Sequence, residues 1–453
     1  MNIYILTEIT KRELDSNLLI AILAANKGHE IFISNMTNFE LLLKKKLLNP
    51  GIFHTKSLVH DDRKRIFHSN LKSSNMILTS LDEENGLVRK DLSPDIDMRF
   101  SSKDLALSDT IFCWGKHDYQ SLKKAYPDHK KKFQLTGSPR VDMWTKKFSN
   151  YWYKNKSNYK NTLLFSMNFG IINGFNPVRN IFKQYEKSGY FKRHENYKNL
   201  LKIYVKESRL LIKEFITLIN YLTDKFDNYQ FIVRPHPKEK LFIWKNKLKK
   251  RKNLIIRNSG NFNKELISAK LVIHNGSTTA FQAAVNKIPV LSFVPFKSKI
   301  SWGEISNNLG LLCDDKKKVE LNIRNIFNNK NLINKKKISK ILNYKLASTR
   351  NISTFKIISI WSKLGKKIKK VKNNYFAISC YIYFLEQINL IKRFIFKTLN
   401  LKKNVNYKYD TKFEELKLSE ITYKIESLKK ILGIKSNFRI IVLSKKFLII
   451  KKI

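Results

Sequence analysis

The stretches FIVRPHPKE, from Phe231 to Glu239, and LVIHNGSTTAFQAA, from Leu271 to Ala284, decide the fold of this chain. Each is an apolar run that ends abruptly in small or polar residues. That pattern is typical of a buried parallel strand whose carboxyl end opens onto a ligand crevice. Two such strands, about forty residues apart, predict one nucleotide site in an α/β domain.

The second stretch predicts a strand, a short turn and a helix. The apolar spacing from Ala280 to Val285 suits the helix. Backbone N–H groups and the positive end of the helix dipole would face a ligand at the turn, and hydroxyl groups would add donors. The predicted contacts are Asn275, Gly276, Ser277, Thr278 and Thr279. The alternative is that the Ser and Thr residues only cap the helix.

The first stretch predicts a phosphate contact at His236. This residue lies between Pro235 and Pro237, which hold its backbone extended, and it follows a strand that ends in Arg234. An imidazole fixed beside an arginine at a strand end is well suited to grip a phosphate. The alternative is a structural or surface histidine.

Together, RPHP and HNGSTTA resemble the histidine-proline and serine/threonine motifs of GT-B glycosyltransferases that use CMP-activated acidic sugars, the bacterial sialyl- and Kdo-transferases. Over nearly its full length, the chain resembles the bacterial family called surface carbohydrate biosynthesis proteins. Further matching strings are PGIFHTKSL (Pro50–Leu58), DEENGL (Asp82–Leu87), IFCWGKHDYQ (Ile111–Gln120), TGSPRVDMW (Thr136–Trp144) and FEELKLSEITYKIESLKKILG near the C-terminus. The chain departs from GT-B enzymes at Gln282, where they often carry a glutamate that holds the donor ribose. A neutral amide still bonds to a hydroxyl.

The resemblance implies an α/β GT-B fold, in which two Rossmann-like doubly wound domains face each other across a cleft. It predicts an acceptor domain over residues 1–155, a donor domain over 156–350, and a C-terminal appendage of helices and a β-hairpin over 351–453. The interdomain linker is expected at Asn150 to Lys160, and the active site between the two domains.

Short apolar runs that alternate with helical patterns support this architecture. The expected strands are Asn2–Leu6, Glu30–Ile33, Met76–Thr79, Thr110–Trp114, Phe133–Thr136 and Thr162–Ser166, and the expected helices include Arg12–Asn26 and Ser208–Phe226. Near the C-terminus, Phe413–Leu432 predicts one or two helices and Phe438–Ile449 a pair of strands. Tyr375 to Leu401 predicts an amphipathic helix that either packs on the first domain or lies on a membrane.

The composition of the chain restricts its possible functions less than the motifs do. A chain of 453 residues predicts two or three domains. The formal charge of +52 would suit nucleic acid, but no nucleic-acid motif accompanies it, and a basic surface also suits an anionic membrane leaflet. Three widely spaced cysteines indicate neither a disulfide framework nor a metal cluster, and they favour a reducing compartment. We find no apolar run near the roughly 18 residues of a transmembrane helix.

The candidate catalytic base lies in the segment TSLDEENGL. Asp82, Glu83 and Glu84 follow a first-domain strand and resemble the acidic-acidic-glycine motif that supplies the base in CMP-sugar enzymes. Because Asn85 intervenes before Gly86, both Glu83 and Glu84 stay candidates for the base. A neighbouring carboxylate would raise the pKa of one of them. The alternative is a solvated acidic turn.

Other candidate contacts are distributed over both predicted domains. In the first, Lys11, Arg12 and Glu13 follow the first strand, and Ser138 and Arg140 follow a later one. With Asp82, they are expected to line the acceptor side of the cleft. In the second, Asn168, Gly170 and Pro237 are expected to contact the donor. Arg234, His236 and the turn at Ser277 would offset charge on the CMP phosphate without a metal ion.

The resemblance therefore implies an inverting, metal-independent glycosyltransferase of lipopolysaccharide or capsule biosynthesis that needs no cofactor. Its donor would be a CMP-activated Kdo- or nonulosonate-like sugar, and its acceptor a glycan or lipid-linked glycan. The expected location is cytoplasmic, peripheral on the inner face of the membrane. The alternatives are a CDP-glycerol-type polyol phosphotransferase, a UDP-sugar epimerase, a noncatalytic polysaccharide-assembly scaffold and a nucleic-acid-binding protein.

Overall fold

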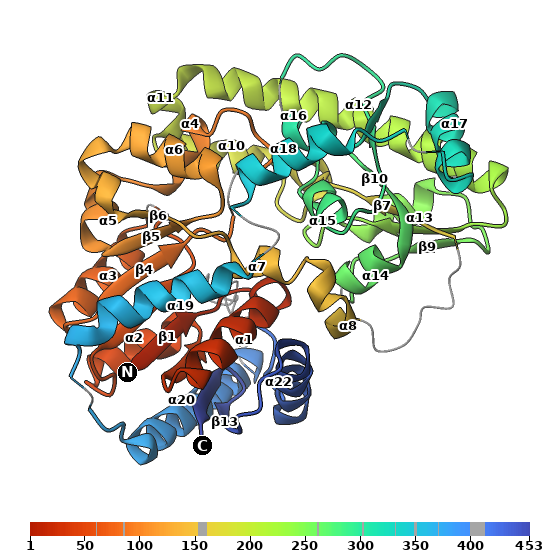
Figure 1. Cartoon of the computed structure of the whole chain (residues 1–453). Coiled ribbons are helices and arrows are strands. Elements are labelled where there is room, and N and C mark those ends of the chain that lie inside the picture. The colour runs from red at the N-terminus through yellow and green to blue at the C-terminus, as the bar shows by residue number, and fades with distance from the viewer. Residues whose placement is uncertain are drawn as a thin grey trace. The chain divides into compact units, whose positions relative to one another are not determined.

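Contacts divide the chain into two compact units (Figure 1). The computed structural model describes residues 1–59, 61–84, 87–152, 161–260, 262–300, 303–330, 332–347, 351–369, 371–398 and 413–453. Unit 1 comprises Met1–Asn85, Ser93–Tyr151 and Asn343–Ile453, and unit 2 comprises Gly86–Leu92 and Trp152–Leu342.

Unit 1 is built on a sheet with the strand order β13-β14-β2-β1-β3-β4-β5-β6. Its strands are β1 (Asn2–Leu6), β2 (Glu30–Ser34), β3 (Gly51–Thr55), β4 (Ile77–Leu81), β5 (Thr110–Cys113), β6 (Phe133–Leu135), β13 (Phe438–Ser444) and β14 (Phe447–Lys452). Strands β1 to β6 pair in parallel. The expected C-terminal hairpin is present, and β14 pairs antiparallel with β2, so the hairpin forms one edge of this sheet.

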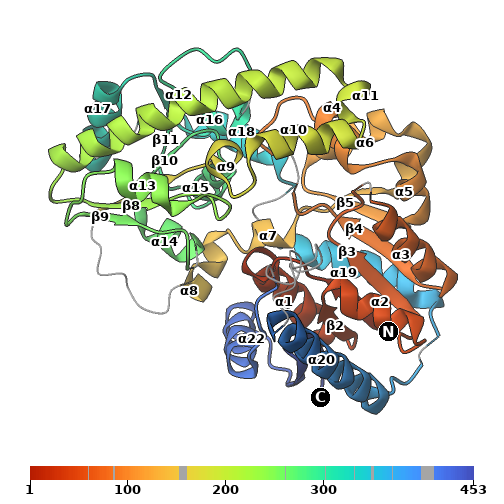
Figure 2. The same cartoon turned by 180° about the vertical axis from the view of Figure 1, so that it is seen from behind.

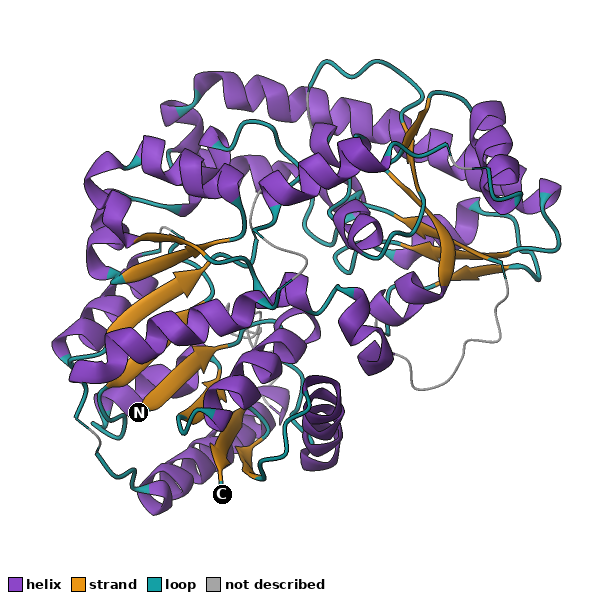
Figure 3. Ribbon diagram, viewed as in Figure 1, coloured by secondary structure: helices purple, strands orange, loops and turns teal. Residues whose placement is uncertain are grey.

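Helices cover the unit 1 sheet (Figure 3). They are α1 (Thr10–Asn26), α2 (Met36–Lys44), α3 (Asp62–Ser73), α4 (Ser93–Arg99), α5 (Ser102–Leu107), α6 (Lys116–Ala125), α7 (Pro139–Asp142), α19 (Ser353–Leu364), α20 (Tyr375–Thr398) and α22 (Leu418–Leu432), with 3₁₀ turns η1 (Pro127–Lys132), η2 (Lys146–Phe148) and η3 (Gly365–Lys367). Two more, α8 (Ser149–Trp152) and α18 (Lys335–Lys345), continue into unit 2. One core joins the strands to α2, α3 and α20 through side chains such as Phe53, Phe39, Phe67 and Ile378. Helix α1 packs against α7, α19 and α22.

Unit 2 is built on a second sheet, in which every strand pair is parallel. The strand order is β12-β11-β10-β7-β8-β9. The strands are β7 (Thr162–Ser166), β8 (Gln230–Arg234), β9 (Leu254–Ile256), β10 (Ala269–His274), β11 (Val290–Phe293) and β12 (Leu311–Cys313). Its helices are α9 (Gly170–Asn173), α10 (Val178–Lys187), α11 (Tyr190–Arg193), α12 (Glu195–Lys225), α13 (Leu241–Lys247), α14 (Phe262–Ser268), α15 (Thr279–Val285), α16 (Glu304–Asn307) and α17 (Lys316–Phe327) (Figure 2).

Each parallel sheet has one point at which its strand order reverses. In unit 1 this point lies between β1 and β3, and in unit 2 between β7 and β10. At such a switch point the loops that follow the two strands leave in opposite directions, and the crevice between them is where open α/β sheets bind ligands. The topology therefore defines one candidate binding position in each unit.

The α/β class and the two Rossmann-like units of the GT-B prediction are confirmed. The six strands expected from the sequence are present, with ends that shift by up to two residues. The pattern missed β3, whose apolar run is interrupted by His54, a residue that lies inside the sheet. It also placed the start of α12 too late, at Ser208. The helix begins at Glu195, because Tyr197, Leu201 and Val205 add a buried stripe to its first turns.

Two further predictions concern the linker and the C-terminal region. The start of the expected linker belongs to α8, and residues 153–160 lie outside the described residues. The expected amphipathic helix is α20, and its packing on unit 1 is confirmed, because Ile378 and Ile382 are buried in the core. Within the described ranges, we find no helix with the length and apolarity that crossing a bilayer requires.

Candidate functional site

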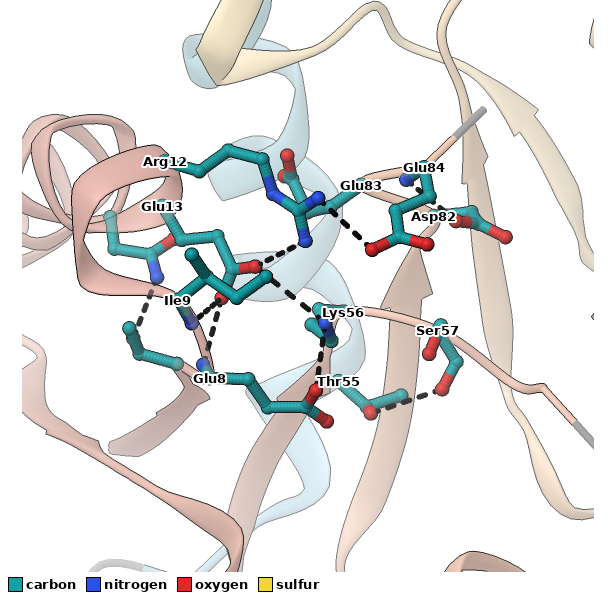
Figure 4. Close-up of polar contacts among 12 residues, drawn as sticks. Glu8, Ile9, Arg12, Glu13, Thr55, Lys56, Ser57, Asp82, Glu83 and Glu84 are labelled. Atoms are coloured by element: carbon teal, nitrogen blue, oxygen red, sulfur yellow. Dashed lines mark hydrogen bonds and ion pairs between the residues drawn. The ribbon is translucent and has the colours of Figure 1, made fainter. Parts of the chain in front are cut away.

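A cluster of ionisable side chains lies at the switch point of unit 1 (Figure 4). The loops that follow β1, β3 and β4 supply most of it, because parallel strands end at the same edge of the sheet. The cluster comprises five carboxylic acids, Glu8, Glu13, Asp82, Glu83 and Glu84, and five cationic groups, Arg12, Lys56, Lys64, Arg99 and Arg140. We call these ten residues the strand-end cluster.

Glu13 fixes the start of α1 and one side of the cluster. Its Oε2 accepts hydrogen bonds from the backbone N–H groups of Glu8 (2.8 Å) and Ile9 (3.1 Å), which precede the helix. Its Oε1 pairs with Arg12 Nη2 at 2.8 Å, and Lys56 Nζ lies 3.7 Å away. Glu13 is therefore a buried helix cap and an ion-pair partner, rather than a side chain at an exposed helix start.

Arg12 connects α1 to the acidic segment after β4. Its Nη1 donates to Glu84 Oε1 at 3.0 Å. Burial alone would raise the pKa of Glu84, but Arg12, Lys56 and Arg99 together lower it to about 2. Asp82 forms a bidentate pair with Arg99, in which Nη2 lies 2.6 Å from Oδ1. Glu84 is therefore charged at neutral pH, and both carboxylates are paired with arginine.

Glu83 differs from its two neighbours. Burial raises its pKa to about 7, a shift that the nearby Arg140 opposes and Glu13 reinforces. Its Oε2 is buried and has no hydrogen-bond partner among the described residues, and Arg140 Nη1 lies 3.9 Å away. A carboxyl group that titrates near neutral pH is suited to accept and release a proton. Of the two candidate bases, Glu83 has the pKa near neutral pH and Glu84 the lowered pKa.

The other residues that were predicted to line the sugar-acceptor side of the cleft divide into two groups. Ser138 is buried and caps α7, and its Oγ accepts from Arg140 N at 3.2 Å. Arg140 donates from Nη1 to the Glu83 carbonyl at 3.0 Å, so this loop supports the acidic segment. Lys11 points away from the cluster and pairs with Glu414 at 2.8 Å on the surface. We therefore leave Lys11 out of the candidate site.

At the switch point of unit 2, the loops after β7 and β10 are held to each other. The backbone N–H of Asn168 donates to Asn275 Oδ1 at 3.0 Å, and Asn275 Nδ2 donates back to the Asn168 carbonyl at 3.3 Å. Thr279 Oγ1 donates to Ser166 Oγ at 2.8 Å. We call residues 167–170 and 275–279 the switch loops. They bring together three of the predicted donor contacts, Asn168, Asn275 and Thr279.

The expectation that the turn offers unpaired N–H groups to an anion is wrong for Gly276 and Ser277. Both groups donate to Nδ1 of His274, at 2.9 and 3.1 Å. The other ring nitrogen of His274, Nε2, lies 2.9 Å from Ser292 Oγ on β11. Because Nδ1 accepts, Nε2 carries the proton and donates to this hydroxyl. Burial lowers the pKa of His274 to about 3, so the imidazole is neutral.

The sequence predicted no role for His274, although it stands in the quoted motif. A histidine at the last position of a buried strand, followed by Asn-Gly-Ser, is the signal that would have found it. Gly276 adopts a φ of 75°, which closes the turn onto the ring. The hydrogen-bond acceptor that shapes the turn is therefore His274 of the chain itself. Thr278 is exposed, and Ser277 caps the turn by accepting from Thr279 N at 3.3 Å.

His236 lies beside the first switch loop. A Cβ atom added at Gly170 would lie 3.7 Å from His236 Nδ1. That nitrogen accepts from Lys238 N at 3.1 Å, so Nε2 is the protonated nitrogen and can donate to a phosphate. Pro237 follows in the same turn.

A buried glutamate that the sequence analysis did not single out holds this turn. Glu239 is fully buried, and it accepts from the backbone N–H groups of Phe169 and His236, each at 2.9 Å. It also accepts from Trp244 Nε1 at 3.0 Å and Asn173 Nδ2 at 3.2 Å. Four donors thus converge on one carboxylate, which joins the loop after β7 to the loop after β8.

Arg234 has a different role from the predicted phosphate contact. Its guanidinium is buried and pairs with Glu265 of α14, with Nε 3.1 Å from Oε2. It also donates to the carbonyls of Ser259 and Gly260. Most of the N–H groups of Arg234 therefore already donate to other groups of the protein, and the side chain supports the end of β8.

A small cavity adjoins the switch loops within unit 2. Its lining includes Tyr204 and Ser208 of α12, Asn275 and Gly276, and the segment from Phe293 to Phe296 after β11. Its volume of about 80 Å³ suits part of a ligand, since pockets for whole small molecules are roughly 300–1,000 Å³. Asn307 also lines it, and the buried Oδ1 of Asn307 has no hydrogen-bond partner among the described residues. The same holds for the buried Oε1 of Gln282 on α15.

Among the described residues, no group of three or more His, Cys, Asp or Glu side chains is placed to hold a metal ion. In the strand-end cluster, ion pairs with Lys and Arg engage the carboxylates. The predicted metal-independent mechanism stays a prediction.

No protein-family model matches the chain, and no curated protein matches it. Among solved structures, it is similar to a "putative UDP-N-acetylglucosamine 2-epimerase" from Listeria monocytogenes, with a TM-score of 0.51, 10% identity and coverage of 82% of this chain and 98% of that one. A second UDP-N-acetylglucosamine 2-epimerase has a TM-score of 0.51, 9% identity and the same coverage. The wall teichoic acid polymerase TagF has 14% identity, covers 70% of this chain and 73% of its own, and has a TM-score of 0.44, too low to support an argument.

At these identities the likeness shows the fold alone. The chain has the two-unit α/β fold of these nucleotide-sugar enzymes over about four fifths of its length. The comparisons give no support to the CMP-sugar resemblance, which remains a hypothesis based on the two sequence motifs.

Proposed function

We propose that the protein is an enzyme that acts on a nucleotide-activated sugar, and that it inverts one carbon centre of the sugar in a UDP-sugar. The observation that carries the proposal is Glu83, a buried carboxyl group with a pKa of about 7 at the switch point of unit 1. One route inverts the sugar carbon next to the anomeric carbon: a base removes its proton, and the electron pair forms a double bond as the nucleoside diphosphate leaves. A proton then returns to the opposite face as the diphosphate adds back to the anomeric carbon. Glu83 is the group suited to the removal.

The cationic members of the strand-end cluster support this chemistry. Negative charge develops on the sugar and on the leaving diphosphate while the proton is removed, and Arg12, Lys56 and Arg140 lie close enough to Glu83 to lower its pKa. Fixed positive groups in a buried site stabilise such charge more than water does. The likeness to two solved epimerases favours this reaction over the alternatives.

We assign nucleotide binding to the switch loops of unit 2. The His236 imidazole lies beside the first switch loop and is the candidate phosphate contact, and the cavity beside Asn275 accommodates part of the nucleotide. The unpartnered Gln282 Oε1 and Asn307 Oδ1 are acceptors suited to ribose hydroxyl or base N–H groups.

A second candidate is transfer of a CMP-activated acidic sugar to a glycan acceptor. The motifs RPHP and HNGSTTA favour it, and Glu83 would then deprotonate the acceptor hydroxyl. Lipopolysaccharide or capsule would be the product, and cytoplasmic assembly the setting.

The test combines nucleotide titration with exchange in D2O. The purified protein is titrated with UMP, UDP, CMP and CDP by calorimetry, then incubated with UDP-N-acetylhexosamines in D2O and followed by NMR. We expect UDP to bind preferentially and deuterium to replace one carbon-bound hydrogen of the sugar as a second epimer forms.

Other outcomes identify the alternatives. Preferential CMP binding, with CMP release from a CMP-sugar only when an acceptor glycan is present and with no exchange, would establish the transferase. Preference for CDP would indicate a polyol phosphotransferase. Absence of binding to every nucleotide would refute both enzyme proposals and leave the scaffold.

A further inference from the structure

Helix α20 has two apolar faces, and the unit covers one of them. Ile378 and Ile382 are each 1% exposed and pack in the core with Phe39 and Phe447. The opposite side of the helix carries exposed apolar residues. They are Phe376 (80% exposed), Tyr383 (63%), Phe384 (58%), Leu390 (52%), Ile391 (58%) and Ile395 (44%).

The spacing places the exposed residues on one side. At 3.6 residues per turn, the six residues fall within an arc of roughly 140°, whereas Ile378 and Ile382 fall about half a turn from the middle of that arc. In Figure 2, α20 lies at the outer edge of its unit, next to α2. A helix that is apolar all round is normally buried all round. One face of α20 is therefore left for a partner.

The surroundings of this face are strongly basic. Between Ile352 and Thr398 the sequence has one acidic residue, Glu386, and ten lysines and arginines. Glu386 is itself engaged, because Lys445 N donates to its Oε1 at 3.0 Å. Lys366, Lys367, Lys369 and Lys372 are exposed and precede the helix directly.

This combination identifies the partner. We propose that the exposed face of α20 binds an anionic membrane surface, with Phe376, Phe384 and Ile391 inserted among the lipid headgroups and the preceding lysines in contact with anionic lipid. Apolar anchors beside a basic segment are the physical requirements of interfacial membrane binding. The helix lies in the plane of the membrane, because its other face is fixed in the protein core.

A second copy of the chain fits this face less well. The formal charge of +52, with the lysines beside the helix, opposes close approach of two identical surfaces. The proposal does not depend on the proposed enzymatic function.

The chain provides its own probe for this test. Cys380 is exposed on the same side of α20, while Cys113 and Cys313 are buried. We would label Cys380 with a polarity-sensitive fluorophore and add phosphatidylcholine vesicles with or without phosphatidylglycerol. We expect a blue shift and co-flotation with the anionic vesicles, both weakened by added salt.

Matched variants locate the contact. Phe376→Ser, Phe384→Ser and Ile391→Ser together should lower the partition coefficient at least about tenfold, since each removes an apolar anchor. Changing Lys366, Lys367 and Lys369 to glutamate should abolish the preference for anionic lipid. Ile66→Ser and Phe242→Ser, at residues 62% and 69% exposed elsewhere, should leave binding unchanged.

Several results would overturn the proposal. They are no binding to either vesicle, equal binding to both, or binding that the triple serine variant retains. Sedimentation equilibrium tests a further outcome. If the wild type were a dimer and the triple serine variant a monomer, the exposed face of α20 would bind a second copy of the chain. Circular dichroism of each variant confirms that the fold is intact.

Discussion

The two switch points occupy equivalent positions in their sheets but differ in chemistry. At the unit 1 point, five carboxylic acids and five cations form the strand-end cluster, and Glu83 has a pKa of about 7. At the unit 2 point, the switch loops offer amides and hydroxyls arranged around His274, whose pKa is about 3. Glu83 therefore titrates near neutral pH, and His274 does not.

This difference shows how one topology supports two tasks. The crossover of strands provides a crevice in both units, but the residues that follow the strands decide its chemistry. Ionisable groups in unit 1 suit proton transfer. Neutral, mutually bonded groups in unit 2 suit a rigid platform that holds a ligand without changing charge. Each prediction below alters one side of this comparison.

The largest effect is expected for Glu83→Gln in unit 1. The amide keeps the shape of the side chain but cannot accept the proton, so turnover should fall about 100- to 10,000-fold. Nucleotide affinity, measured by calorimetry, should stay within about twofold because the switch loops are unchanged. In the wild type, turnover should rise with pH through about 7 as Glu83 loses its proton.

Two controls accompany this change. Glu84→Gln removes a carboxylate that is already ionised and paired, and turnover should keep the wild-type pH profile. Stability gives an independent readout. The raised pKa of Glu83 means that its favourable contribution is complete below about pH 4.5 and is lost as pH rises through about 7. Glu83→Gln should therefore be at least as stable as the wild type at pH 8. Full turnover in this variant would exclude Glu83 as the base.

The next effect concerns Glu239 in unit 2. Glu239→Ala removes the acceptor that four donors share in a fully buried position, and Asn173 Nδ2 alone of the four keeps a second one, the Lys240 carbonyl. We expect the free energy of unfolding to fall by about 2–4 kcal/mol. Nucleotide binding should weaken as well, because the turn that carries His236 loses its support. Urea denaturation measures the first effect and calorimetry the second.

Glu214 provides the matched control for this change. It is exposed on α12, and Glu214→Ala should alter stability by no more than about 0.5 kcal/mol. If the two variants were equally stable, Glu239 would not organise the loops after β7 and β8.

The sequence predicted the positions of both sites better than their contacts. Strand ends could be read from apolar runs, so Glu83 and the switch loops were placed correctly next to β4, β7 and β10. Lys56 was missed because it follows β3, whose strand GIFHT has only two consecutive apolar residues, Ile52 and Phe53, between Gly51 and His54. Arg99 lies on α4, and no local pattern shows that its guanidinium returns to Asp82.

The errors in unit 2 have the same origin. Arg234 appeared available for phosphate because its partner, Glu265, lies on a helix 31 residues later in the chain. The N–H groups of Gly276 and Ser277 were expected to be unpaired because no role was given to His274, whose ring accepts from both of them. Sequence periodicity shows which residues end strands. It does not show which side chains from other elements meet there.

The smallest expected effect concerns His274 in unit 2, and it tests the contrast between the two switch points. His274 is neutral in the folded protein, because burial lowers its pKa to about 3, and it titrates near 6.5 when unfolded. Its contribution to stability is therefore complete above about pH 6.5 and is lost as pH falls toward about 3. This dependence is opposite in sign to that of Glu83.

His274→Leu removes both the acceptor for the Gly276 and Ser277 N–H groups and the titrating group. At pH 7.5 we expect a loss of about 1–3 kcal/mol in the free energy of unfolding. The difference in the free energy of unfolding between the variant and the wild type should be smaller by about 1–2 kcal/mol at pH 5.5. Only the wild type loses stability there, because only it carries the histidine that becomes protonated on unfolding. Ser292→Ala removes the partner of Nε2 but keeps the imidazole. The difference in the free energy of unfolding between this variant and the wild type should therefore stay nearly constant with pH. A constant gap for His274→Leu would mean that the histidine is not held neutral, and the platform in unit 2 would then titrate as the cluster in unit 1 does.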